Sequence, residues 1–191
     1  MLSTLQERIA RIVASLPESD GFALAGGAAL VVAGVVDRST RDLDFFGPSG
    51  DDVQRLAAAV EQALTDAGVQ IRRERATHTF VRFSIADGDD STELDLAADA
   101  RIRPAELGPL GPMLSVEELA ADKLLALFDR AQARDFLDVA ALIDRFSADE
   151  LGIQEAARRE LSRSIQQWRH DLAGMSPRPK PRRELGPDLS L

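Results

Sequence analysis

The chain contains no cysteine, and only two of its 191 residues are histidines. The missing cysteine excludes disulfide bonds, cysteine-based zinc sites and a thiol nucleophile. The two histidines, His78 and His170, are too few for a histidine-rich metal site. No apolar run reaches the roughly 18 residues that a membrane span needs, and no signal peptide opens the chain, so we expect a cytoplasmic protein without a membrane partner.

Basic residues are outnumbered by acidic ones, 23 against 32, which gives a net charge of −9. This balance argues against a general nucleic-acid binder but leaves room for local basic surfaces. Three such clusters occur, at Arg72, Arg73 and Arg75, at Arg101 and Arg103, and in the tail at Arg178, Lys180, Arg182 and Arg183. Taken singly, each is expected to be a solvated face or a chain end. The 45% hydrophobic content is enough for a real core, in one domain or a domain with an appendage.

The segment 24–46 organises the chain. A short apolar run at 22–25 is typical of a buried strand, and the glycine pair Gly26-Gly27 allows a tight turn and a close approach to a ligand. The Ala- and Val-rich residues 28–36 favour a short helix. A helix that opens after a glycine turn presents free N–H groups and its positive dipole end, so this turn is a candidate phosphate site.

An alternating pattern follows at Asp42-Leu43-Asp44-Phe45. Successive side chains of a strand point to opposite faces, so Asp42 and Asp44 share one face and the apolar residues take the other. Two carboxylates on one face repel each other unless a cation lies between them. Oxygen ligands of this kind suit Mg²⁺.

The later part of the chain predicts further elements. Helices are expected at 3–15, 51–67, 115–130, 134–146 and 149–171, and strands at 69–71, 79–85 and 92–96. These three strands are expected to continue the sheet in antiparallel fashion. Residues 101–114 are rich in proline and glycine and are expected to link the sheet to a helical part, and the segment after Gly174 is expected to be flexible.

The strand at 92–96 places Asp95 on the face opposite Leu94 and Leu96. If this strand lies beside the one that carries Asp42 and Asp44, Asp95 becomes a third carboxylate of the same site. Glu93 shares the face of Asp95 and is the weaker candidate.

The order of these features resembles the polymerase-β-like nucleotidyltransferases. More narrowly, GGAAL…DRSTRDLDFF is similar to the AbiEii/AbiGii (MenT-type) toxins, and residues 121–142 are similar to the second signature of that branch. The resemblance implies an α+β fold: a nucleotidyltransferase core at 1–112, with a mixed sheet flanked by helices, then a C-terminal helical subdomain at 113–174 and a Pro/Arg-rich tail at 175–191. Relatives usually carry Ser or Thr after the glycines where this chain has Ala28, so phosphate binding must depend on backbone N–H groups and cations.

The resemblance also implies roles for individual residues. Two Mg²⁺ ions would be held by Asp42, Asp44 and Asp95, and Asp95 would assist deprotonation of the acceptor hydroxyl. A lysine and a later aspartate of the second signature would belong to the active site, and these are Lys123 and Asp138, with Asp135 as the alternative. The nucleotide-binding residues would be Gly26, Gly27, Arg38, Ser39, Thr40, Lys123 and Arg130.

The implied reaction moves NMP from an NTP to an acceptor hydroxyl, and pyrophosphate leaves. The implied acceptor is RNA, in the first place the 3′ end of tRNA, and the result is a block of translation that a cognate antitoxin relieves. Two alternatives stay open: a nucleotidyltransferase that modifies a small molecule such as an aminoglycoside, or a protein hydroxyl, and a catalytically silent module that binds a nucleotide or a partner.

Ser39 and Thr40 lie between Arg38 and Arg41, directly before the Asp42 strand. They serve either as a turn residue and a strand cap or as groups that line the triphosphate site. A phosphoryl group on either hydroxyl would add about −1.5 to −2 charges beside Asp42. We therefore expect Thr40, and less so Ser39, to be possible sites of regulatory phosphorylation.

Overall fold

A computed structural model describes residues 1–101, 103–129 and 132–147. The helices are α1 Thr4–Ser15, the short 3-10 helix η1 Pro17–Ser19, α2 Gly26–Val32, α3 Gly50–Asp66, α4 Val116–Asp129 and α5 Ala133–Arg145. The strands are β1 Ala23–Ala25, β2 Asp42–Gly47, β3 Gln70–Thr77, β4 Phe80–Asp87, β5 Asp90–Ala98, β6 Glu106–Gly108 and β7 Gly111–Met113. All described residues belong to one compact unit, Met1–Gln154. None of their helices is both long and apolar enough to cross a bilayer.

Three expectations fall outside the described residues: the helix at 149–171, the tail at 175–191 and the nucleotide-binding role of Arg130.

The strands form one mixed sheet in the order β3-β4-β5-β2-β1-β7-β6. Strands β3, β4 and β5 are antiparallel to one another, as expected, but β5 joins β2 in parallel. The pair β1 and β7 is parallel too, whereas β1 with β2 and β6 with β7 are antiparallel. The expected α+β fold with a mixed sheet flanked by helices is confirmed.

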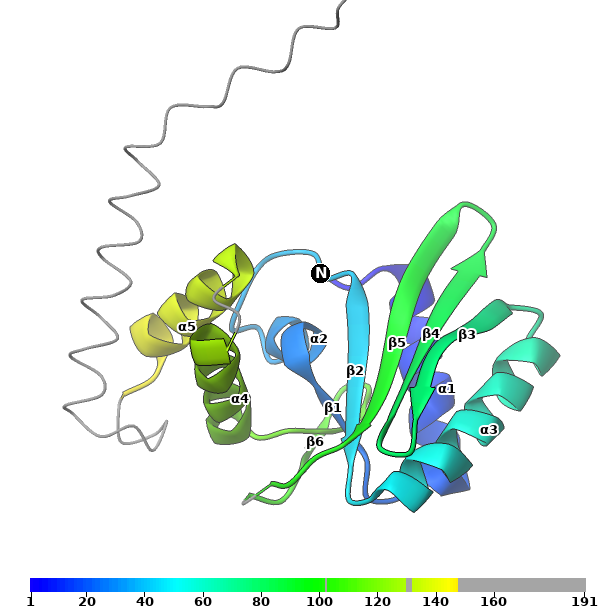
Figure 1. Ribbon diagram of the computed structural model, residues 1–191. Helices are drawn as coiled ribbons and strands as arrows, with labels where there is room; N and C mark the ends of the chain where they lie inside the picture. Colours follow the sequence, from blue (N-terminus) through cyan, green and yellow to red (C-terminus); the bar gives the residue numbers. More distant parts are fainter. Residues whose placement is uncertain (102, 130–131, 148–191) are drawn as a thin grey trace, which may run out of the picture. The chain divides into compact units, whose positions relative to one another are not determined.

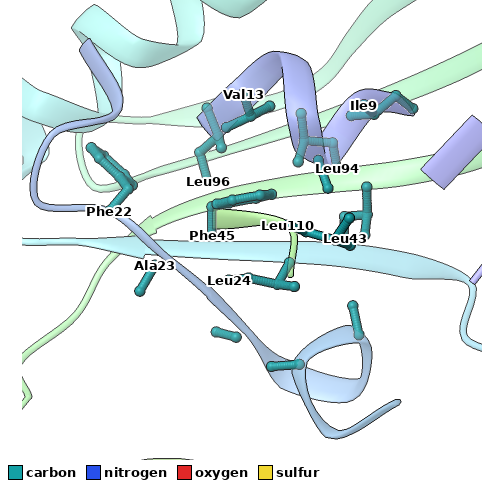
Figure 2. Close-up of a cluster of buried hydrophobic side chains, with 14 of the residues drawn as sticks. Ile9, Val13, Phe22, Ala23, Leu24, Leu43, Phe45, Leu94, Leu96 and Leu110 are labelled. Atoms are coloured by element: carbon teal, nitrogen blue, oxygen red, sulfur yellow. The ribbon is translucent and has the colours of Figure 1, made fainter. Parts of the chain in front are cut away.

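The core lies between the sheet and helix α1. Leu5, Ile9 and Val13 recur every four residues, so they form one apolar stripe, and all three are buried. The capping box between Ser3 and Gln6 satisfies the free N–H groups at the start of this helix. Figure 2 shows Ile9 and Val13 above apolar side chains of β2 and β5, and α2 lies on the other side of the strands.

Alternation along β2 and β5 separates the core from the functional face. Leu43, Phe45, Leu94 and Leu96 are at most 3% exposed and pack toward α1. The intervening acidic residues point to the opposite side. Figure 1 shows α1 and α3 on one side of the sheet and α2, α4 and α5 on the other, so the acidic face meets the second group of helices.

The helix expected at 28–36 begins two residues earlier and ends four residues earlier. Gly26 has a φ of +60°, which lets the chain turn from β1 straight into α2. Gly34 has a φ of +66° and ends the helix, and the N–H of Val35 donates to the Leu30 carbonyl oxygen at 2.9 Å. The glycine pair is therefore the first turn of the helix and not a loop before it.

The segment expected to be only a linker, 101–114, also contains the β6–β7 hairpin, and β7 extends the sheet beside β1. Each strand has three residues, and β7 includes Pro112, so no alternating pattern marks it. The pairing of Leu24 with Met113 is a long-range contact that the local sequence does not reveal. The strand expected to begin at 69–71 runs from Gln70 to Thr77.

Candidate active site

The sheet brings three carboxylates together. Because β2 and β5 are parallel neighbours, Asp44 lies directly opposite Asp95, and Asp42 lies opposite Glu93. The sequence predicted that Asp95 would join this site if its strand lay beside the strand of Asp42 and Asp44. The structure shows that these two strands, β5 and β2, are adjacent. Burial in the first place, and then the charges of Asp42 and Asp95, raise the pKa of Asp44 to about 7, against the opposing effect of Lys123 and Arg134.

The glycine pair makes room for these groups. A Cβ on Gly26 would lie 1.9 Å from Asp44 Oδ2, so no other residue fits there without displacing the carboxylate. A Cβ on Gly27 would lie 3.0 Å from both Arg38 Nη2 and Thr40 Oγ1. Both glycines are thus required by the close approach of functional side chains.

Asp95 is held by an arginine that the sequence analysis did not single out. Arg82 Nε lies 2.7 Å from Asp95 Oδ1 and Arg82 Nη2 lies 2.5 Å from Asp95 Oδ2, which is a bidentate ion pair. The two residues are register partners on β4 and β5. Alternation with buried Val81 and Phe83 gives the side of β4 that Arg82 takes, but not its partner.

Helices α4 and α5 contribute a buried ionic network. Lys123 is 6% exposed, and its Nζ lies 2.8 Å from Oδ2 of the fully buried Asp138. Asp138 also accepts two hydrogen bonds from Arg38, at 2.8 Å from Nε and 2.7 Å from Nη2. This pairing raises the pKa of the Arg38 guanidinium. Lys123 is therefore not a surface lysine, and Asp138 holds Lys123 together with Arg38.

Asp135 has a different position from Asp138. Its carboxylate caps the start of α5, where it accepts a hydrogen bond from the Gln132 N–H at 3.3 Å. It lies 3.9 Å from Lys123 Nζ, against 2.8 Å for Asp138. The geometry thus favours Asp138 as the aspartate that positions Lys123.

The segment before β2 reaches the same site. Thr40 Oγ1 donates to Asp42 Oδ1 at 2.9 Å. Ser39 is exposed, and its carbonyl oxygen accepts a hydrogen bond from Arg38 Nη1 at 3.0 Å. Thr40 is therefore the one of the two hydroxyls that touches a carboxylate.

A hollow of about 310 Å³ lies between the sheet and α4, and we call it the first hollow. Its lining includes the three aspartates, both glycines, Arg38, Arg82 and Lys123, and also Asp99, Asp122 and Arg134. Burial raises the pKa of Asp122 to about 6, with Asp99 and Glu118 contributing. Arg134 Nη1 lies 3.7 Å from Asp42 Oδ2. The hollow thus combines three carboxylates with cations from helices α4 and α5, from strand β4 and from the segment before β2.

The three carboxylates of Asp42, Asp44 and Asp95 fit a divalent cation in part. Burial is the main cause of the raised pKa of Asp44, and the charges of Asp42 and Asp95 add to it, so a bound cation would favour the ionised carboxylate. Within the described ranges no three Asp, Glu or His side chains are arranged around one metal position. Arg82 pairs with both oxygens of Asp95. Asp42 and Asp44 would therefore be the better ligands of a cation.

Replacing Asp44 by Asn should stabilise the metal-free protein at alkaline pH. The folded-state pKa of about 7 lies above the ordinary value of 3.8, so the wild type loses stability as the pH rises through this window. Asn carries no charge and avoids that loss. In EDTA, we expect Asp44→Asn to unfold a few degrees higher than the wild type at pH 8, at about 2–4 °C per kcal/mol, and by less at pH 5.5.

Thermal unfolding followed by circular dichroism measures this difference. Asp87→Asn is the matched control, because Asp87 lies at the exposed end of β4 and pairs only with Arg8 at the surface. An equal gain at both pH values, or no gain at pH 8, would contradict the raised pKa of Asp44.

Comparisons with known proteins identify the family of the chain. The family described as "Nucleotidyl transferase AbiEii toxin, Type IV TA system" matches residues 9–188. No curated protein matches the chain.

Solved structures share the fold. JHP933 from Helicobacter pylori has a TM-score of 0.58 at 18% identity, over 91% of this chain and 99% of its own. A proposed nucleotidyltransferase from H. pylori has a TM-score of 0.64 at 23% identity, over 89% and 79%. MenT4, a nucleotidyltransferase toxin from Mycobacterium tuberculosis, has a TM-score of 0.56 at 19% identity, over 82% and 62%.

The resemblance seen in the sequence is thereby confirmed. Because the family match spans almost the whole chain, the function of the family applies to it as a whole. The chain belongs to the AbiEii family and is a nucleotidyltransferase toxin of a type IV toxin–antitoxin system.

Proposed function

We propose that this toxin transfers NMP from an NTP to the 3′ end of an RNA in the cytoplasm, in the first place a tRNA, and so blocks translation until its antitoxin acts. The observation that carries the proposal is the first hollow, where three carboxylates face Lys123 and Arg38. A triphosphate needs cations of this kind, and an acceptor hydroxyl needs a nearby base. The RNA acceptor itself follows from the resemblance to MenT-type toxins.

In this proposal, Asp42 and Asp44 would hold Mg²⁺, which would supply charge neutralisation for the transfer. Lys123 and Arg38 orient the triphosphate, and Asp138 fixes both cations. The acceptor oxygen attacks the α-phosphorus, the bond from that phosphorus to the bridging oxygen of the β-phosphate breaks, and pyrophosphate leaves. The hydroxyl proton goes to Asp95, whose carboxylate is oriented by Arg82.

The test uses the whole chain with Mg²⁺, total RNA and each NTP labelled at the α-phosphate. We expect label on RNA of tRNA size, from one or a few of the four NTPs, and none in EDTA. Label on a small molecule or on protein would favour the alternative acceptors. No label on any acceptor would favour the silent binding module.

A negative charge at Thr40 should silence the enzyme. Thr40 Oγ1 already lies 2.9 Å from Asp42 Oδ1, so a phosphoryl group or a glutamate there would meet like charge at the metal ligands. We expect Thr40→Glu to lose transfer and Thr40→Ala and Ser39→Ala to keep at least part of it. Transfer assays check the variants, and mass spectrometry of toxin co-expressed with its antitoxin checks for modification. Full activity of Thr40→Glu would leave Thr40 only as a cap of β2.

A further inference from the structure

A second hollow opens beside the first, where β2 begins. Its volume is about 570 Å³, and its walls are residues 40–42, strands β4 and β5, and the start of α5. It shares Asp42, Arg82 and Arg134 with the first hollow. A ligand bound in the second hollow would therefore reach Asp42, which also lines the first hollow, where the triphosphate is proposed to bind.

The lining of the second hollow is polar and has unused hydrogen-bonding capacity. Ser84 and Ser91 line it, and neither hydroxyl makes a hydrogen bond to another described residue. Ser84 lies opposite Glu93 in the sheet, so a hydroxyl donor and a carboxylate acceptor stand side by side. Hydroxyls and carboxylates in this arrangement suit the sugar of a nucleotide.

Three arginines also line the second hollow, Arg41, Arg82 and Arg134. Arg41 is exposed and forms no ion pair with any residue that the structure describes. Arg134 Nε is buried without a hydrogen-bond partner among the described residues. Arg82, by contrast, is already paired with Asp95 and lies 3.5 Å from Glu93. The exposed guanidinium of Arg41 suits a phosphate diester, which accepts hydrogen bonds through its unesterified oxygens, and the Arg134 side chain, 40% exposed, adds a second positive charge.

We propose that the second hollow binds the terminal sugar-phosphate of the acceptor RNA strand. This inference rests on the proposed function. Transfer requires the NTP and the acceptor to meet at Asp42, and Lys123 of α4 and Arg38 before β2 assign the NTP to the first hollow. The second hollow then delivers the acceptor hydroxyl, with Arg41 and Arg134 on the phosphate and Ser84 and Glu93 on the sugar.

Two substitutions of opposite sign test this assignment. Arg41→Glu replaces a cation at the hollow by an anion and leaves the backbone carbonyl of Arg41, which accepts from Thr92 Oγ1, in place. Ser91→Arg adds a cation at an exposed position of β5. Arg55→Glu is the matched control, since Arg55 is 64% exposed on α3, on the other side of the sheet.

We expect Arg41→Glu to raise the half-saturating RNA concentration by about tenfold or more and Ser91→Arg to lower it several-fold, with the NTP half-saturation unchanged in both. The salt dependence of RNA half-saturation should become shallower by about one unit in Arg41→Glu, because one phosphate contact is lost. Arg55→Glu should match the wild type.

The possible failures are distinguishable. A wild-type protein that labels no RNA refutes the proposed function, and label on protein instead assigns a different acceptor to the hollow. A wild type that labels RNA, together with wild-type RNA half-saturation in Arg41→Glu and Ser91→Arg, refutes the second hollow alone. A change in NTP half-saturation without a change for RNA would assign this hollow to the nucleotide and overturn the inference.

Discussion

Alanine at Asp42 or Asp44 is expected to abolish nucleotidyl transfer, by roughly 10³-fold or more, because several kcal/mol of charge stabilisation in the transition state would be lost. Both side chains point away from the core, from strand positions next to buried Leu43. The substitutions therefore remove charge without opening a cavity, and the protein should stay folded. The measurement is initial rate at saturating NTP and RNA, beside a thermal unfolding curve for each variant.

Asp87→Ala is the control for removal of a carboxylate from the same sheet, and it should keep the wild-type rate. Asp95→Ala should also lose activity, and it additionally releases Arg82 from its bidentate pair. A folded Asp42→Ala or Asp44→Ala with transfer near the wild-type rate would exclude these residues as metal ligands.

The position of these carboxylates could largely be predicted from the sequence. Strict alternation in 42–46 and 92–96 determines which face each side chain takes, since the strand period is two. Alternation does not show which strands are neighbours in the sheet. The prediction for Asp95 was therefore conditional, and only the parallel pairing of β2 with β5 brought it opposite Asp44.

Arg82 escaped the sequence analysis for a related reason. An arginine between buried Val81 and Phe83 is typical of any strand with one solvated face, so the pattern carries no functional signal by itself. Its role appears only when β4 lies beside β5 and Arg82 meets Asp95. The β6–β7 hairpin was missed because three-residue strands with proline and glycine leave no periodicity to detect.

For Lys123, the local sequence and the family resemblance predict different positions. Lys123 lies among leucines at 119, 124, 125 and 127, a pattern that by itself favours a surface lysine on an amphipathic helix. Burial of a lysine requires a partner, and that partner, Asp138, lies on the next helix, with Arg38 from the segment before β2 on its other side. The position of the Lys123 side chain thus depends on Asp138 and Arg38, which lie in other segments of the chain. No short stretch of sequence contains all three residues.

Removing the charge of Lys123 should lower transfer by roughly 10²-fold, as is typical when a preorganised charge contact is lost. We expect Lys123→Met to remain folded, because methionine fills the buried space of the lysine stem and Arg38 still compensates Asp138. The rate is measured at saturating and at low NTP. Wild-type rates at both concentrations would mean that the lysine serves only as a buried counterion.

Asp138→Asn tests the same ionic network by changing the ion-pair partner of Lys123. It leaves Lys123 and Arg38 as two neighbouring cations without their shared carboxylate, and breaking a buried pair in this way costs about 3–5 kcal/mol. We therefore expect both a lower unfolding temperature and a higher half-saturating NTP concentration. The double variant Lys123→Met with Asp138→Asn should recover part of the stability, because one of the two unpaired cations is gone, but none of the transfer rate. Recovery of transfer in the double variant would show that Lys123 does not act on the triphosphate.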